Sequence, residues 1–179
     1  MEAALPDLPV LAVTVLGTDH LGIVADVTAA LAAVGGNLED STMTLLRGHF
    51  AMVVLVRTDR PPGDVEVALA SLTTDGGLVV DVRALPVGSS AAPSGAAFTL
   101  RVHGADRPGI VAAITRVVAD HGGTIVDLGT RLSRGLYVLT AELQLPVGAT
   151  PVRLEEQLTA AARQVGVEVH LDPVDDDLL

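Results

Sequence analysis

Hydrophobic residues in the first half of the chain alternate between two periodicities, one typical of strands and one of helices. A short run rich in β-branched residues predicts a buried strand, and Ile23, Val27 and Leu31 then recur at helical spacing. Gly35-Gly36 is a typical helix end, and Arg47-Gly48 a typical hairpin turn. The predicted elements are strand 10–16, helix 21–34, strand 38–46, strand 50–57, a second helix capped by Asp64, and strand 78–85.

The same pattern recurs in the second half of the chain. The stretch 17–24 aligns with 104–111, an offset of 87 residues, and Gly35-Gly36 then matches Gly122-Gly123 without a gap. Such internal repetition indicates one supersecondary unit written twice. The predicted elements are a strand from about 96 containing Phe98, Leu100 and Val102, a helix with Pro108 in its first turn, strands 124–133 and 136–145, a helix capped by Thr150 before Pro151, and strand 167–171.

Each half therefore has the element order βαββαβ. This order predicts an α+β protein of two tandem ferredoxin-like domains, each an antiparallel four-stranded sheet with two helices on one face. The expected boundaries are residues 1–85 for the first domain and 96–179 for the second, which ends in an acidic C-terminal tail. Residues 86–95 have the composition of a linker. The fold alone predicts no chemistry.

Composition narrows the classes of function. Hydrophobic residues make up 49% of the chain and aromatic residues 2%, so the cores must be built from aliphatic side chains. A net charge of −11 argues against direct nucleic-acid binding, and the lack of cysteine excludes disulfides and thiolate chemistry. With neither a signal peptide nor a run long enough to span a bilayer, we expect a cytoplasmic protein without membrane attachment.

The loop between the first strand and the first helix is the best candidate for binding. Free N–H groups at a helix start favour an anion, and Asp19 lies near enough in sequence to meet an ammonium group. An amino acid carries both charges. Alternatively, Gly22 only permits tight packing and Asp19 only satisfies loop amides. His20 faces this loop and is a further candidate contact.

Asn37 is the second candidate, because its amide suits either charged group of an amino acid. The predicted topology places Asn37 and the first loop at opposite ends of the first helix, so they would meet only if two domains packed side by side. Asn37 is equally suited to a plain turn after a helix. The second copy has Thr124 there, which lacks the amide.

No other pattern indicates chemistry. The histidines form no HExxH motif or close pair, so we expect no metal site, and the serines form no nucleophile elbow. No phosphate-binding glycine motif is present, so no cofactor is expected. We therefore predict no catalytic residues.

The loops 17–24 and 104–111 resemble the G-x-D-R-P-G-I-V opening of ACT domains, and Gly36-Asn37-Leu38 with its flanks resembles the G-x-N-I-x-D-S that follows. The tandem pair is most similar to the glycine cleavage system transcriptional repressor group. The resemblance implies binding of an amino acid at interfaces between ACT domains. The residues that match the family's ligand positions are Asp19, His20, Leu21, Gly22, Ile23, Asn37 and Leu38, with Asp106, Arg107, Pro108, Gly109, Ile110, Thr124 and Ile125 in the second copy.

Two departures from the family pattern bear on the site. His20-Leu21 replaces Arg-Pro in the first copy, and Thr124 replaces Asn in the second. Either each copy has lost part of the family's ligand-binding residues, or the loop of one copy and the strand start of the other together form one site across an interface. The resemblance implies a non-catalytic regulatory protein, involved in transcriptional regulation, that acts through a protein partner and forms a homo-oligomer. The alternatives are an assembly module that binds nothing and the regulatory subunit of a separate enzyme.

Overall fold

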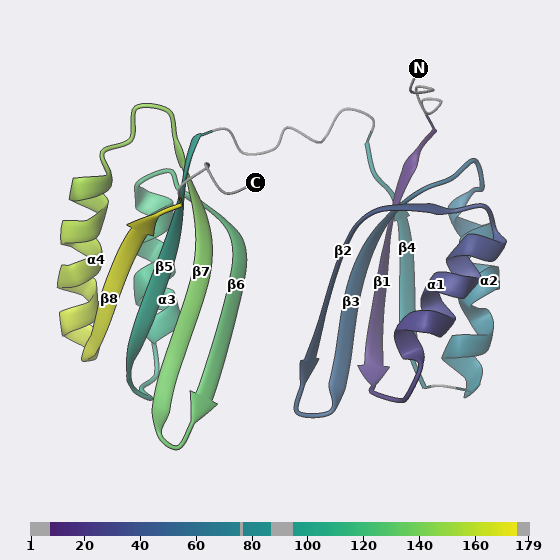
Figure 1. Ribbon diagram of the computed structural model, residues 1–179, viewed down its shortest axis with the longest axis horizontal. Helices are drawn as coiled ribbons and strands as arrows, with labels where there is room; N and C mark the ends of the chain where they lie inside the picture. Colours follow the sequence, from purple (N-terminus) through teal and green to yellow (C-terminus); the bar gives the residue numbers. More distant parts are fainter. Residues whose placement is uncertain (1–7, 76, 87–94, 175–179) are drawn as a thin grey trace. The chain divides into compact units, whose positions relative to one another are not determined.

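The computed structural model describes residues 8–75, 77–86 and 95–174 (Figure 1). Contacts divide the chain into two compact units, residues 1–89 and 90–179, which are described separately below. Most of the predicted lead-in at residues 1–9, of the linker at 86–95 and of the end of the acidic tail lies outside the described residues. None of the helices in the described part of the chain is long and apolar enough to cross a membrane.

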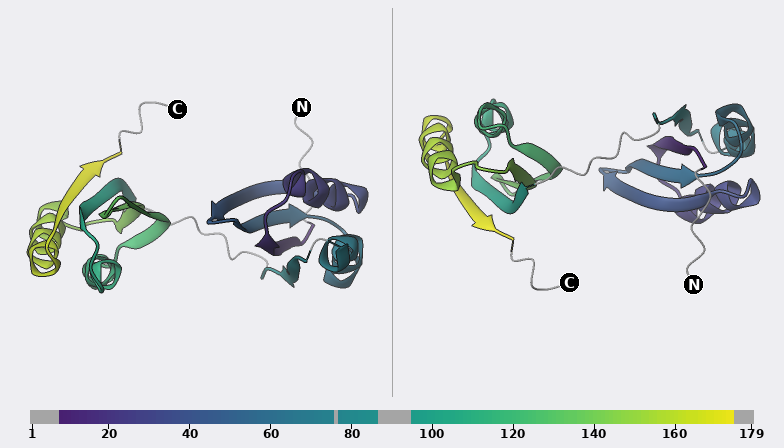
Figure 2. Two further views of the ribbon diagram at one scale, coloured as in Figure 1. Left: turned by 90° about the horizontal axis from the view of Figure 1, so that it is seen from below. Right: turned by 90° about the horizontal axis from the view of Figure 1, so that it is seen from above.

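Unit 1 is one antiparallel sheet with both helices on the same face (Figures 1 and 2). The strand order is β2-β3-β1-β4, so β1 and β3 are central while β2 and β4 form the edges. The elements are β1 (Val10–Thr18), α1 (Ile23–Ala33), β2 (Asn37–Leu46), β3 (His49–Arg57), α2 (Pro62–Asp75) and β4 (Val79–Ala84). Unit 1 therefore has the predicted βαββαβ order.

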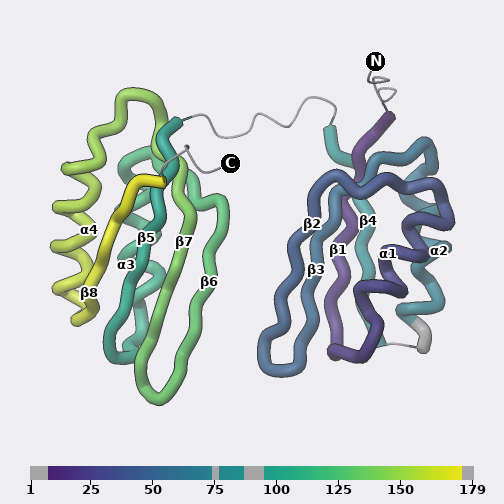
Figure 3. Tube along the Cα trace, viewed as in Figure 1, coloured from purple at the N-terminus to yellow at the C-terminus, as the bar shows by residue number. Residues whose placement is uncertain are grey.

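Unit 2 repeats this arrangement with the strand order β6-β7-β5-β8. Its edges are β6 and β8, and α3 and α4 cover one face of the sheet (Figure 3). The elements are β5 (Gly95–Ala105), α3 (Ile110–Asp120), β6 (Thr124–Ser133), β7 (Leu136–Pro146), α4 (Pro151–Val165) and β8 (Val167–Pro173). The two units confirm the predicted α+β fold of tandem ferredoxin-like domains.

Each core lies between the sheet and its two helices and is almost entirely aliphatic. In unit 1, Leu11, Val13 and Val15 alternate along β1 toward the helices and are at most 1% exposed. Val27 and Leu31 of α1 pack against them at helical spacing. Because alternate residues of a strand point to opposite faces, the same alternation leaves a second sheet face without helices. This uncovered face is called the open face below.

The first helix of each unit begins later than predicted. α1 begins at Ile23 rather than at residue 21, and α3 begins at Ile110. Pro108 therefore lies before the N-cap residue Gly109 and not in the first helical turn. The cause is the left-handed conformation of the preceding glycine, φ +89° at Gly22 and +91° at Gly109, which turns the chain sharply into the helix.

The cap predicted for α2 is also wrong. This helix begins at Pro62, so Asp64 lies in its first turn, where its N–H donates to the Pro61 carbonyl at 3.0 Å. A proline at the first helical position needs no N–H partner, and this lets the helix start earlier. Thr150 is the N-cap of α4 with Pro151 following, as predicted.

The helix ends follow the predicted glycine pairs. Gly36 N–H donates to Leu31 O at 3.0 Å and Gly35 N–H to Ala32 O at 3.0 Å. Gly123 and Gly122 make the matching pair of bonds at the end of α3. These are the two bonds of a Schellman motif, and they satisfy carbonyls that the helix end would otherwise leave open.

Candidate functional site

Two glycines lie near the loop that joins β1 to α1, and the backbone requires each of them for a different reason. Gly17 lies inside β1, where an added Cβ would stand 2.6 Å from Leu78 Cδ2 and 3.0 Å from the Gly77 carbonyl. Gly22 has open space instead, since its added Cβ would meet only Asp26 Oδ2 at 3.8 Å. Tight packing therefore does not explain Gly22, and its positive φ does.

The first helix of each unit, α1 or α3, begins with backbone N–H groups that are free to donate hydrogen bonds. The Asp26 N–H makes the first bond back to the Gly22 carbonyl, at 2.9 Å. Within the described residues, the N–H groups of Val24 and Ala25 have no acceptor, and in unit 2 the same holds for Ile110, Val111 and Ala112. Such donors, together with the positive end of the helix dipole, favour an anionic group.

Side chains make the two loops electrostatically different. In unit 1 the Asp26 carboxylate lies beside the helix start and would repel an incoming anion. Unit 2 has no acidic residue in the first turn of α3 and carries Arg107 in the loop. The Arg107 guanidinium lies against Gly166 at the end of α4, where the helix dipole favours a cation. The loop of unit 2 is therefore the better site for a carboxylate.

His20 is less available than its position suggests. Its Nδ1 lies 3.3 Å from the Leu21 carbonyl, and its Nε2 is inaccessible to solvent and has no hydrogen-bond partner among the described residues. Leu21, by contrast, is fully exposed. Asp19 is exposed, and its N–H donates to the Gly48 carbonyl at 3.0 Å, which ties the loop to the β2–β3 hairpin.

The second group of predicted site residues lies at the other end of the unit. Asn37 begins β2 and pairs with Arg57, which in turn pairs with Val10 at the start of β1. The loop follows Thr18 at the far end of β1, roughly 26 Å away at the rise of a strand. Asp19, His20, Leu21 and Gly22 thus gather at one end, while Asn37 and Leu38 lie at the other. The topology predicted this separation.

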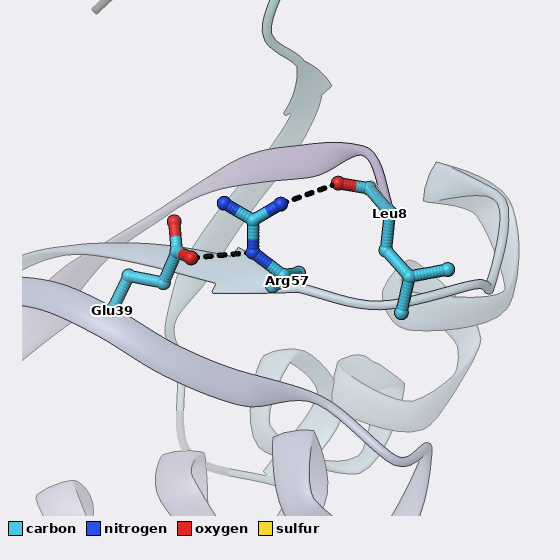
Figure 4. Close-up of polar contacts among 3 residues, drawn as sticks. All are labelled: Leu8, Glu39 and Arg57. Carbon is cyan, nitrogen blue, oxygen red and sulfur yellow. Dashed lines mark hydrogen bonds and ion pairs between the residues drawn. The ribbon is translucent and has the colours of Figure 1, made fainter. Parts of the chain in front are cut away.

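An ion pair that the sequence pattern did not reveal holds the start of β2 (Figure 4). The register shifts between Leu38 and Asp40, so Glu39 is the extra residue of a β-bulge. Arg57 donates through Nε to Glu39 Oε1 and through Nη1 to the Leu8 carbonyl at 2.9 Å. Both side chains of the pair are about three-quarters buried, at 23% and 28% exposed. Their charges lie beside Asn37.

Unit 2 keeps the bulge and loses the ion pair. The shift recurs between Ile125 and Asp127, with Val126 in place of Glu39. Gln144 pairs with Thr124 and has a buried Oε1 without a hydrogen-bond partner in the described part of the chain. Ile23 and Ile110 are core residues, so only their backbone can meet a ligand, and Ile125 is half-buried. Among the described residues, the ion pair at the start of the second strand is thus confined to unit 1.

A pocket of about 420 Å³ lies elsewhere in unit 2, where the end of α3 meets the first turn of α4. Its lining includes Asp120, His121, Thr150, Arg153 and Gln157. None of the predicted site residues lines it.

The described residues also bring three possible metal ligands together. His103 on β5 and Glu168 and His170 on β8 present ligand atoms that all lie within 4.8 Å of one another. The expectation of no metal site rested on histidine spacing along the chain, and 67 residues separate His103 from His170. Antiparallel pairing of β5 with β8 brings them together. The signal in the sequence was the Glu-x-His pair of one strand facing a histidine of its neighbour.

Comparison with known proteins gives matches over both units. The ACT domain family model matches residues 10–83 and 97–172. UPF0237 protein MK1213 of Methanopyrus kandleri is 39% identical over 69 residues, which cover 38% of this chain and 77% of that protein. That relative therefore corresponds to a single unit of the present chain.

The solved structures that match nearly the whole chain include two with a high structural similarity. An unknown protein from Galdieria sulphuraria is 30% identical, with a TM-score of 0.79 over 93% of this chain and 99% of that one. A candidate glycine cleavage system transcriptional repressor is 20% identical, with a TM-score of 0.70 over 94% of this chain and 98% of that one. At 20% identity the second likeness concerns the fold alone.

Proposed function

This chain belongs to the ACT domain family, and from that premise we propose that it is a non-catalytic regulatory protein that binds an amino acid or similar small metabolite. The ligand binds where the loop of one ACT domain meets the second strand of a paired ACT domain. Binding changes the balance between two packings, which a protein partner detects. Regulation of glycine cleavage or of amino-acid metabolism, which the resemblance of the sequence motifs implies, fits this activity.

The single observation that supports this proposal most is the separation of the two half-sites. Within unit 1, Asn37 and the loop at Asp19 lie at opposite ends of β1. One small ligand can touch both kinds of half-site only when a second ACT domain supplies the other half. The polar groups are also divided between the two units. The loop of unit 2, with Arg107, is the better site for an anion, whereas the start of β2 in unit 1 supplies the side-chain amide of Asn37.

The exposed edge of unit 1 supports pairing. β2 is an edge strand whose residues are exposed except for one of intermediate burial. It nevertheless carries Met43, Leu45 and Leu46, each between 47% and 49% exposed. An apolar edge strand with open backbone groups tends to pair with another strand. We propose that β2 contributes to a homo-oligomer.

Thermal unfolding with each common amino acid in turn, glycine and serine included, tests the proposal. A ligand that binds only the native state raises the midpoint, and at 100 times its Kd it adds about 2.7 kcal/mol of stability. We expect one amino acid to stabilise the chain. No stabiliser at millimolar concentration would favour the alternative of an assembly module, for which the apolar edge of β2 is the supporting feature.

Matched variants locate the site. Asn37→Ala should weaken binding of the stabilising amino acid about 10-fold, the value of one lost hydrogen bond to a charged group. Thr124→Ala at the same place in unit 2 should change it less. Both side chains are exposed, so neither variant should unfold the protein. Equal affinity in the wild type and Asn37→Ala would remove Asn37 from the site.

The loops allow the same design. Arg107→Ala should weaken binding more than His20→Ala, because Arg107 offers an exposed charge whereas His20 Nε2 is covered. The measurement is calorimetric titration of each variant with the stabilising amino acid. The opposite order would assign the ligand to the loop of unit 1.

A further inference from the structure

Three metal-ligating side chains gather on the open face of unit 2, at the end of β5 that leads into the loop and on the neighbouring edge strand β8. His103 lies opposite Glu168 in the β5–β8 ladder, and His170 is two residues further along β8. Cross-strand partners and residues two apart share a face, so all three side chains project from the same side. None of them belongs to the proposed amino-acid site.

The distances suit a single ion. His103 Nε2 lies 3.2 Å from Glu168 Oε2. Two ligands of a tetrahedral zinc ion with bonds of about 2.0–2.1 Å stand about 3.3 Å apart. The rings of His103 and His170 are nearly parallel, at 11° and 5.7 Å between centroids, so the second imidazole lies beside the first. All ligand atoms are within 4.8 Å, so rotations of the exposed Glu168 and His170 side chains bring them into coordination range.

The surrounding charges favour a cation. The neighbouring Arg101 is directed to Asp172, with Nη1 3.4 Å from Oδ2, so its charge is partly balanced by a carboxylate. Glu142 belongs to the same open face through its pairing with Thr99. The chain as a whole carries a net charge of −11, which raises the local concentration of cations.

We propose that His103, Glu168 and His170 form a site for a divalent metal ion of the zinc type. Two imidazoles and one carboxylate are ligands that Zn²⁺ accepts, and three protein ligands leave a fourth position for water or another group. The ion would join the edge strand β8 to the central strand β5. It would therefore stabilise unit 2 against unfolding.

Unit 1 provides an internal comparison. Leu16 stands where unit 2 has His103, and the positions of Glu168 and His170 are taken by Val79 and Asp81. Asp81 instead accepts a hydrogen bond from Arg83 Nε at 2.7 Å. That bond, and then the negative charge of Asp81, raise the pKa of Arg83. The proposal therefore predicts one site per chain and none in unit 1.

Calorimetric titration of the full chain with Zn²⁺, after removal of any affinity tag, tests the site. We expect one equivalent per chain and a rise in the thermal midpoint. Co²⁺ in place of Zn²⁺ should give the intense visible absorption of a four-coordinate ion. His170→Gln and Glu168→Gln alter exposed side chains and remove a direct ligand, so each should weaken Zn²⁺ binding by more than the roughly 10–100-fold lost with a residue that only orients a ligand. The control His49→Gln changes an exposed histidine of unit 1 and should leave binding unaltered.

His103→Gln is a second test on the central strand, and thermal unfolding without metal shows whether that variant is folded. The proposal is overturned if the wild type takes up no Zn²⁺ at tenfold excess. It is equally overturned if His170→Gln binds as tightly as the wild type, since the ion would then sit on other groups such as the acidic tail. The amino-acid proposal is tested separately, by the variants of Asn37, Arg107 and His20, none of which is a ligand of the metal site.

Discussion

The open faces of the two sheets differ far more than the cores beneath them. In unit 1 the face near the end of β1 carries Leu16 and Val79 beside an Asp81–Arg83 ion pair. In unit 2 the same positions carry two histidines and a glutamate within 4.8 Å. The helix-facing residues are hydrophobic in both units, mostly aliphatic with one buried phenylalanine each, Phe50 and Phe98. Residues that the fold requires have been kept in both copies, and residues that only face solvent have diverged.

The loops before the first helices likewise combine a backbone shared by the two units with side chains that differ. The positive-φ glycines Gly22 and Gly109 are present in both copies, since the entry into the helix needs them. The charged groups around them differ, with Asp26 in one copy and Arg107 in the other. The repeat therefore preserves the scaffold twice and distributes its polar groups between the copies.

The largest expected effect is the gain of a whole binding site. Leu16→His, Val79→Glu and Asp81→His together would copy the three ligands of unit 2 onto unit 1. Zinc titration should then reach two equivalents per chain. Leu16→His alone should add none, because one imidazole does not make a site. A triple variant that still binds one equivalent would mean that the matching backbone is insufficient.

The second largest effect is expected when buried side chains at matching positions of α1 and α3 are shortened to alanine. Leu31→Ala removes a fully buried side chain of α1 and should cost about 2–5 kcal/mol of unfolding free energy. Val118 holds the same place in α3, and Val118→Ala should cost about 1 kcal/mol less, because one fewer carbon is removed. Denaturant unfolding measures both. A larger loss for Val118→Ala would show that the core of unit 2 relaxes less.

The entry glycines should behave alike in both units. Gly22→Ala and Gly109→Ala each force an L-residue into a left-handed conformation, at a cost of about 1–2 kcal/mol. No clash contributes, since an added Cβ meets at most Asp26 Oδ2 at 3.8 Å. Gly129→Ala on β6, which has open space and no positive φ, is the control and should be neutral or slightly stabilising. Thermal unfolding of the three variants decides between strain and packing.

The smallest effect is expected at the start of β2. Arg57→Gln gives unit 1 the residue of unit 2 and removes the bonds to Glu39 and Leu8, at a cost of about 1 kcal/mol for a partly buried pair. Arg83→Gln breaks an exposed ion pair and should cause no measurable change. Equal effects of the two variants in urea unfolding would mean that burial of the Arg57 pair contributes nothing.

Most of the fold could be predicted because it depends on local patterns. Alternation of apolar residues predicted the strands, helical spacing predicted the helices, and Gly35-Gly36 predicted a helix end that the hydrogen bonds confirm. The errors lie at helix starts. Pro108 and Asp64 were placed by preference for a position, whereas the backbone angle of Gly109 and the early start at Pro62 decide where the helices begin.

At the candidate site, too, some residues could be predicted from the sequence and others could not. Asp19, Gly22 and Asn37 were indicated by the loop, the helix start and the family pattern, and they stay predictions until a ligand is measured. The Arg57–Glu39 pair could not be foreseen, because it depends on a bulge that shifts the register by one residue. The buried Oε1 of Gln144, which has no partner among the described residues, could not be foreseen either, because its burial depends on the packing around β7.

The sequence by itself determined the repeat, the order of elements and the aliphatic cores, because these follow from periodicity and from residues close along the chain. Only the tertiary structure decided which distant side chains meet. His103 and His170 lie 67 residues apart and become neighbours through the pairing of β5 with β8. Asn37 lies 18 residues from Asp19 and yet at the far end of the sheet. Strand register sets both outcomes, and it is fixed by the packing of the whole unit.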